Sequence, residues 1–192
     1  MPLAPPPHPI QPPAALVWLV SVAGFALLMA VSARIAVPMI PVPMTFQTWA
    51  VLLAGAATGP VRGMSAVALY LVAGLAGLPV LADGASGPEP FTGPTAGYLA
   101  AFLAAAGLAG WLSVTGRLAR PLSAIVLMIG LHLLILAVGS AWLALSIGAA
   151  PALEHGVLPF LPGAVIKSIL VVAAAFGLVR VARFTPARFR RA

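Results

Sequence analysis

The sequence has no cysteine and few charged residues, and both shortages exclude classes of protein. Without cysteine, neither a disulfide nor a cysteine metal site can contribute to the fold. Only 7% of the 192 residues are charged and 62% are hydrophobic, with a mean hydropathy of +1.12. Such a chain has too little polar surface to cover a soluble globule. We therefore expect an all-α polytopic membrane protein.

Sequence signatures of enzymes are also missing. The chain has no phosphate-binding G-x-x-x-x-G-K-[ST] loop, no G-x-S-x-G and no H-E-x-x-H. Its single aspartate, Asp83, lies in a Gly/Pro-rich segment, which argues against an intramembrane aspartyl pair. We expect no enzyme activity, no catalytic residue, no cofactor and no metal site, so any ATP hydrolysis would come from partner subunits.

Apolar runs between the ionisable residues predict six transmembrane helices. A hydrocarbon core about 30 Å thick needs roughly 20 helical residues. The expected spans are 15–38, 45–58, 63–81, 96–114, 122–147 and 161–181. The second and third should form a helical hairpin broken at Gly59-Pro60, whereas 82–95 and the segment with Glu154 and His155 should be loops. The domain division is a flexible Pro-rich tail (1–14), a transmembrane domain (15–182) and a basic tail (183–192).

The positions of the charges predict the orientation. Arg62, Arg117, Arg120 and the arginines from Arg180 onward fall on one side of this topology, and the three acidic residues fall on the other. Because arginine and lysine in short loops stay in the cytoplasm, both termini should be cytoplasmic. The net charge of +7 could suggest nucleic acid, but the cations lie at span ends. We expect membrane lipid, not nucleic acid, around the chain.

Two cations, Arg34 and Lys167, fall within predicted spans. Arg34 is near a span end, where its long side chain can reach the interface. Lys167 follows Pro162-Gly163, which marks a helix start where a ligand or neighbouring backbone can approach closely. An intramembrane cation is a functional hypothesis. We favour ligand binding for Lys167, with an interfacial anchor as the alternative.

Four segments resemble successive motifs of the BioY family of biotin transporters. They are VPMTFQTWAVLLAGAATGPVRG (42–63), LYLVAGLAGLPV (69–80), FTGPTAGYLAAF (91–102) and PFLPGAVIK (159–167). The resemblance covers most of residues 38–170. It implies the six-helix fold of the substrate-binding S component of an energy-coupling factor (ECF) transporter in the bacterial cytoplasmic membrane. It also implies high-affinity biotin uptake with a transmembrane coupling (T) subunit and ATP-binding (A) subunits.

One position departs from the family pattern. Ala164 stands where BioY proteins usually carry Asp, three residues before Lys167 and on the same helix face. The resemblance implies that this Asp and the Lys face biotin together, since a carboxylate accepts from the ureido N–H groups and an ammonium donates to ligand oxygens. Ala164 can do neither and leaves Lys167 without that counterion. We expect normal folding but weakened biotin binding, from either a deliberate substitution or natural divergence.

The complete set of ligand-binding candidates combines the resemblance with the predicted outer loop. It comprises Lys167, Ala164, Tyr98, Thr95, Ser86, Asp83 and Gln47. Tyr98 can stack on a ligand or act as an interfacial aromatic residue. Gln47 can bond a ligand, although a bond to a neighbouring helix is the favoured role. Asp83, Ser86 and Thr95 lie in a Gly/Pro-rich loop, where polar residues often serve only to form turns. His132 is interpreted as forming a hydrogen bond to a neighbouring helix.

Small residues on the first predicted span indicate a close helix contact. The resemblance implies that such residues dock the coupling subunit, and the candidates are Ala26, Ala30, Ser32 and Ala36. Internal packing is the alternative. Three functions remain open at this stage: biotin uptake, uptake of another small vitamin, and a non-transporting membrane scaffold. A homo-oligomer is also left open.

Overall fold

The computed structural model describes residues 13–184, with side chains described up to residue 178. Its longer helices are α1 (Ala14–Ala33), α2 (Gln47–Thr58), α3 (Pro60–Leu75), α5 (Ala96–Val114), α6 (Pro121–Ile147) and α8 (Leu161–Phe184). The shorter elements are β1 (Ala36–Val37), β2 (Met44–Thr45), η1 (Ala82–Gly84), α4 (Glu89–Thr92), α7 (Ala149–Gly156) and η2 (Leu158–Phe160). Most of the two predicted tails, 1–14 and 183–192, lies outside the described residues.

Four helical segments in the described part are long and apolar enough to cross a membrane. They are Ala14–Ala33, Ala96–Val114, Pro121–Ile147 and Ala149–Leu178. The chain is therefore a multi-pass membrane protein. At 1.5 Å per residue, the 12 residues of α2 extend about 18 Å and the 16 residues of α3 about 24 Å. Six complete crossings remain a prediction.

The predicted hairpin at Gly59-Pro60 is confirmed. Gly59 has a φ of +86°, which an L side chain rarely adopts, and it separates α2 from α3. Pro60 takes the first position of α3. A backbone N–H at this position has no partner within the helix, so its absence in proline costs no hydrogen bond. The next loop starts earlier than predicted, because α3 ends at Leu75 rather than near Leu81, and Gly77 follows with a φ of +97°.

The predicted end of the first span was wrong. Helix α1 stops at Ala33, and the chain continues into an antiparallel pairing of β1 with β2, in which Ala36 faces Thr45. Pro38 disfavours the helical conformation of the residue before it, and branched side chains at Ile35 and Val37 favour extended backbone. The docking candidate Ala36 consequently lies in a strand and not on the first helix.

Two predicted loops contain helices. The segment 82–95 includes η1 and α4, and the segment with Glu154 and His155 forms α7. Gly148, with a φ of +87°, ends α6 and lets α7 begin immediately, since its backbone can turn where other residues would be strained. The Gly and Pro residues of 82–95 and the polar residues Glu154 and His155 marked the breaks between the long helices correctly, but they gave no sign of the short helices in these segments.

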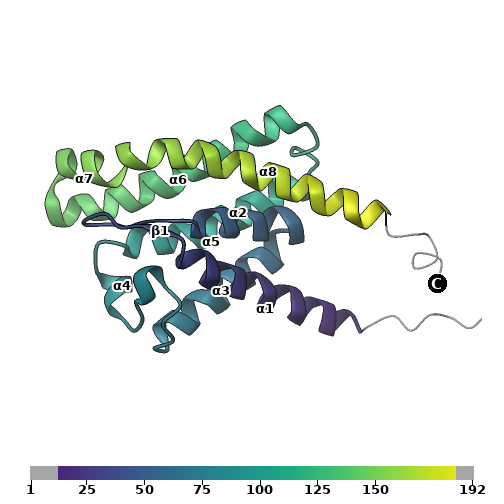
Figure 1. Cartoon of the computed structure of the whole chain (residues 1–192), viewed down its shortest axis with the longest axis horizontal. Coiled ribbons are helices and arrows are strands. Elements are labelled where there is room, and N and C mark those ends of the chain that lie inside the picture. The colour runs from purple at the N-terminus through teal and green to yellow at the C-terminus, as the bar shows by residue number, and fades with distance from the viewer. Residues whose placement is uncertain (1–12, 185–192) are drawn as a thin grey trace, which may run out of the picture.

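Figure 1 shows how the elements are placed along the molecule. The start of α1 and the end of α8 lie at one end, whereas the β1–β2 hairpin, α4 and α7 lie at the other. Helices α2, α3 and α5 pack in the middle, and most side chains of α2 are buried. The short elements between the helices therefore gather at the end away from the two described chain ends.

Candidate ligand-binding cavity

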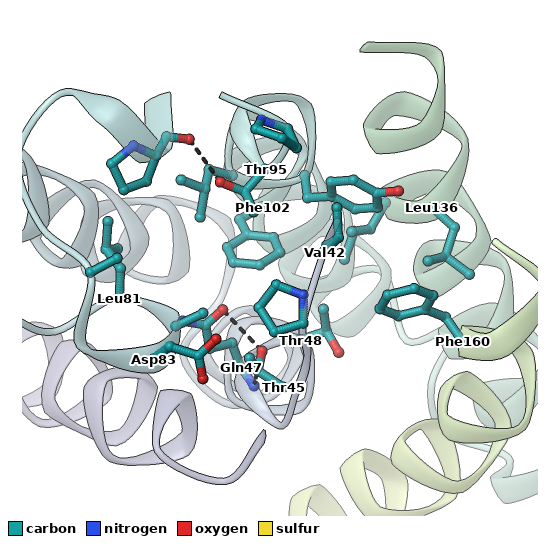
Figure 2. Close-up of a pocket in the computed structure, with 18 of the residues that line it drawn as sticks. Val42, Thr45, Gln47, Thr48, Leu81, Asp83, Thr95, Phe102, Leu136 and Phe160 are labelled. Atoms are coloured by element: carbon teal, nitrogen blue, oxygen red, sulfur yellow. Dashed lines mark hydrogen bonds between the residues drawn. The ribbon is translucent and has the colours of Figure 1, made fainter. Parts of the chain in front are cut away.

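A cavity of about 370 Å³ opens among the short elements and the nearby helix ends. This volume lies within the roughly 300–1,000 Å³ typical of small-molecule sites. Figure 2 shows Thr45, Gln47 and Thr48 along one border, and Leu136 with Phe160 along another. The lining comes from the loop after β1, the start of α2, segment 81–95, α5, α6, η2 and α8.

Lys167 is the only lysine or arginine that lines this cavity among the described residues. Its side chain is 7% exposed, and Nζ donates a hydrogen bond to the carbonyl oxygen of Thr45 at 3.0 Å. Within residues 13–184, no carboxylate forms an ion pair with it. A buried ammonium without a counter-anion is unfavourable. Lys167 therefore has hydrogen-bonding capacity that a polar ligand can use.

Ala164 lies one helical turn before Lys167 and also lines the cavity. Its side chain is 3% exposed. Three residues along a helix keep two side chains on one face, so the sequence-based pairing of these positions on one wall is confirmed. The methyl group offers no hydrogen bond, and this part of the wall is apolar.

Gln47 is held by protein partners. Its Oε1 accepts from Thr45 Oγ1 at 3.0 Å, and its Nε2 donates to the hydroxyl oxygen of Tyr70. Tyr70 in turn donates to the carbonyl oxygen of Val80 at 3.1 Å. This chain of bonds ties α2 to α3 and to the loop that follows α3. The side chain also borders the cavity, so both predicted roles remain compatible with its position.

Tyr98 is anchored at its hydroxyl and borders the cavity with the rest of its side chain. The hydroxyl donates to the carbonyl oxygen of Gly156 at 2.9 Å, and the ring stacks near Phe160 with centroids 6.4 Å apart. Gly139 makes room for the ring, since any Cβ there would collide with it. Tyr98 therefore joins α5 to the end of α7 and offers a ligand mainly an aromatic surface.

The candidates in segment 81–95 differ in their placement. Asp83 is exposed and lines the cavity, and Thr95 lines it while donating to the carbonyl oxygen of Pro90 at 2.9 Å. Ser86 is not among the lining residues. Glu89 is, although its position in a Gly/Pro-rich stretch gave no sequence signal for this role. The segment thus adds two exposed carboxylates to the cavity border.

His132 and Thr48 also line the cavity, although neither is among the ligand-binding residues predicted from the sequence. The predicted role of His132, a hydrogen bond to a neighbouring helix, is confirmed. Its Nδ1 lies 2.9 Å from Ser168 Oγ on α8. His132 Nε2 and Thr48 Oγ1 are buried without a hydrogen-bond partner in the described part of the chain. An isolated His or Thr in an apolar run carries no pattern that would reveal such an atom. No group of three or more metal-binding side chains occurs among the described residues.

Comparisons with known proteins identify the family. A profile of the BioY family matches residues 10–184. This chain belongs to the BioY family. It is 37% identical over 155 residues to a protein of Pyrococcus horikoshii named probable biotin transporter BioY, covering 80% of this chain and 91% of that one. It is 35% identical over 157 residues to biotin transporter BioY2 of Lactococcus lactis subsp. cremoris, covering 81% and 86%.

A solved structure supports the same fold. The crystal structure of the S-component for biotin from an ECF-type ABC transporter superposes with a TM-score of 0.79 at 28% identity, covering 90% of this chain and 95% of the other. The resemblance to the BioY family predicted from four motifs is confirmed, as is the S-component fold. Membership places the chain among membrane transport proteins and not among enzymes.

The predicted docking residues of this BioY-family chain occupy different environments. Ala26 and Ala30 border a shallow apolar groove of about 180 Å³ between α1 and α3. Ser32 is 2% exposed and faces the interior, whereas Ala36 is in β1. Only the first two therefore lie in an apolar surface groove on α1.

Proposed function

We propose that this chain is the biotin-binding S component of an ECF-type vitamin transporter. The observation that carries the proposal is the buried Lys167 in a cavity of about 370 Å³, within a fold shared with an S-component for biotin. Its ammonium suits a ligand oxygen, and the aromatic and aliphatic walls suit an apolar ring system. A cavity with such a residue argues against a simple membrane scaffold.

The proposal includes six crossings with both termini in the cytoplasm of a bacterial cell. The start of α1 and the end of α8 lie at the same end of the molecule, as an even number of crossings requires (Figure 1). The arginine-rich loops favour the cytoplasm for that end. The cavity would then open outward, where Asp83, Thr95 and Tyr98 help to form its border. Coupling and ATP-binding subunits would supply the energy, because the chain has no phosphate-binding loop.

Ala164 is proposed to weaken biotin binding. A carboxylate at this position would accept from a ligand N–H and balance Lys167, and a hydrogen bond to a charged group is worth about 1.5–3 kcal/mol. We expect Ala164→Asp to bind biotin about 10- to 100-fold more tightly. Equilibrium binding of labelled biotin to both purified proteins in detergent measures this change.

An Ala164→Asn variant is the control, because it matches Asp in size without adding a charge. A higher biotin affinity with Asp at position 164, together with little increase in affinity with Asn, would support the proposed role of residue 164. Equal binding by the unchanged chain and Ala164→Asp would refute the weakening. Absence of biotin binding by both would refute the biotin proposal.

The alternative is an S component for another small vitamin, and Ala164 itself favours this candidate. Without a carboxylate, the wall beside Lys167 accepts fewer hydrogen bonds, so a ligand with fewer N–H donors would fit it better. Competition of labelled biotin by a panel of vitamins separates the two candidates. A vitamin that binds the unchanged chain more tightly than biotin does would favour the alternative.

The groove on α1 is proposed to dock the coupling subunit. Small residues let helices approach closely in a membrane, and Ala26 and Ala30 supply them there. Ala30→Arg should abolish co-purification of the coupling subunit while biotin binding persists, because the groove is separate from the cavity. Ala23→Arg, at an exposed position on the same helix, is the control. Retention of the complex by Ala30→Arg would contradict the assignment.

A further inference from the structure

The hydrogen bonds around His132 fix the state of its ring. Nδ1 lies 3.1 Å from the carbonyl oxygen of Met128, which can only accept, so Nδ1 carries the hydrogen. Ser168 Oγ is 2.9 Å from the same Nδ1 and donates its own hydrogen to the carbonyl oxygen of Ala164 at 2.8 Å. The Ser168 oxygen therefore accepts from Nδ1. In a neutral ring held in this way, Nε2 has a free lone pair.

That lone pair has no partner within the part of the chain that the structure describes. His132 is 2% exposed, borders the cavity, and its Nε2 is buried without a hydrogen bond. Buried polar atoms are rarely left unpaired, so each such atom requires an explanation. A ligand donor at the edge of the cavity would supply the missing bond.

His132 lies beside the position that lacks the carboxylate. Ser168 contacts both His132 and the backbone of Ala164, and it follows Lys167 directly in α8. One region of the cavity wall thus combines a donor, Lys167 Nζ, with an unpaired acceptor, His132 Nε2. A ring with an N–H next to a carbonyl, as in a cyclic urea, complements this pair because it offers an acceptor and a donor side by side.

We propose that His132 is a ligand-binding residue whose Nε2 accepts an N–H of the ligand ring while Lys167 donates to the neighbouring carbonyl oxygen. This inference rests on the proposed function, and it assigns to His132 the acceptor role that Ala164 cannot fill. A neutral imidazole is a weaker acceptor than a carboxylate, since hydrogen bonds to charged groups are stronger. Partial compensation by His132 would therefore leave this chain with biotin binding that is weaker than a carboxylate at position 164 would give.

The test compares two substitutions at one position in two backgrounds. His132→Met removes the acceptor at similar size, whereas His132→Gln keeps an amide oxygen at about the same distance from the backbone. In the unchanged background, His132→Met should weaken biotin binding at least about tenfold, and His132→Gln should stay within about threefold. With Ala164→Asp present, His132→Met should weaken binding less than about threefold, because the carboxylate supplies an acceptor.

The outcomes separate a ligand contact from a structural role. Equal losses from His132→Met in both backgrounds would overturn the inference, since a packing defect does not depend on residue 164. Biotin binding by Ala164→Asp but not by the unchanged chain would also overturn it, while leaving the proposed function standing. Absence of biotin binding by both would overturn the proposed function, and the inference with it.

A second measurement needs no substitution in the cavity. Labelling the full-length chain with ¹⁵N-histidine gives signals for its three histidines. Adding biotin should move the His132 Nε2 signal towards the position of a hydrogen-bonded acceptor while Nδ1 keeps its hydrogen. An unchanged His132 signal at saturating biotin would overturn the inference even if every variant misfolded.

Discussion

The packing between α2 and α5 differs from one end of the helix pair to the other. Near the end of α2, Gly55 approaches α5 so closely that a Cβ would collide with the backbone of Ala106. Near the starts of both helices, Thr48 and Phe102 border the cavity instead. One pair of helices therefore forms a tight seam at one end and a binding space at the other.

The difference shows how side-chain size determines where a cavity lies between two packed helices. At the seam, Gly110 contacts the Gly59-Pro60 turn, and Gly63 of α3 contacts Gly55, so three backbones meet without intervening side chains. Small residues permit this close approach in membranes. Larger side chains keep the helices apart at the cavity end. The close helix contacts and the cavity thus lie at opposite ends of one helix pair.

The largest expected effect comes from breaking the seam. In Gly110→Val, the new Cβ would collide with backbone atoms of Gly59 and Pro60, and none of these atoms belongs to a flexible side chain. Overpacking typically costs about 1–3 kcal/mol, and because the colliding atoms are backbone we expect a loss at the upper end of this range, about 3 kcal/mol. Thermal unfolding in detergent measures the stability, and biotin binding should fall with the folded fraction.

The matched control is Gly130→Val. Gly130 also lies within a helix, but an added Cβ there meets nothing within 4 Å. The substitution should leave the unfolding temperature nearly unchanged, since valine is compatible with a helix facing lipid. If both variants were equally destabilised, helix propensity and not the seam would explain the result, and the comparison would fail.

Much of the arrangement of long helices was predictable from sequence, because hydropathy and helix breaks have local causes. The fifth and sixth predicted spans, 122–147 and 161–181, match α6 and most of α8, and Gly59-Pro60 marked the hairpin correctly. The first span was predicted too long, because hydropathy continues into 34–38 while the backbone becomes extended. The pairing of β1 with β2 joins Ala36 to Thr45 and Val37 to Met44, and a hydropathy pattern does not encode which residues pair across a turn.

The site was only partly predictable, for a related reason. Lys167 stood out because charge is rare in an apolar span, and Ala164 stood out only through the family resemblance. His132 gave no comparable signal, since its significance depends on which ring nitrogen is already bonded. That information comes from Met128 and from Ser168 on another helix. Tertiary hydrogen bonds thus decide which polar residues still have a free atom.

A smaller expected effect concerns Gln47, which borders the cavity and also holds α2 to its neighbours. Gln47→Met removes the bonds to Thr45 and Tyr70 and should destabilise the fold by about 1–3 kcal/mol, as for a buried polar network. Biotin affinity should fall less than about tenfold, because the described bonds of Gln47 go to protein. Unfolding and binding measured on the same samples separate the two quantities.

Tyr70→Phe provides the comparison for that prediction. If Gln47 acts through Tyr70, the double variant should lose less stability than the sum of the single losses, since both substitutions disrupt one network. Additive losses would indicate that the two residues act independently. A large loss of affinity in Gln47→Met with unchanged stability would instead assign Gln47 to the ligand, and the boundary between the tightly packed part of α2 and the cavity would then lie after residue 47.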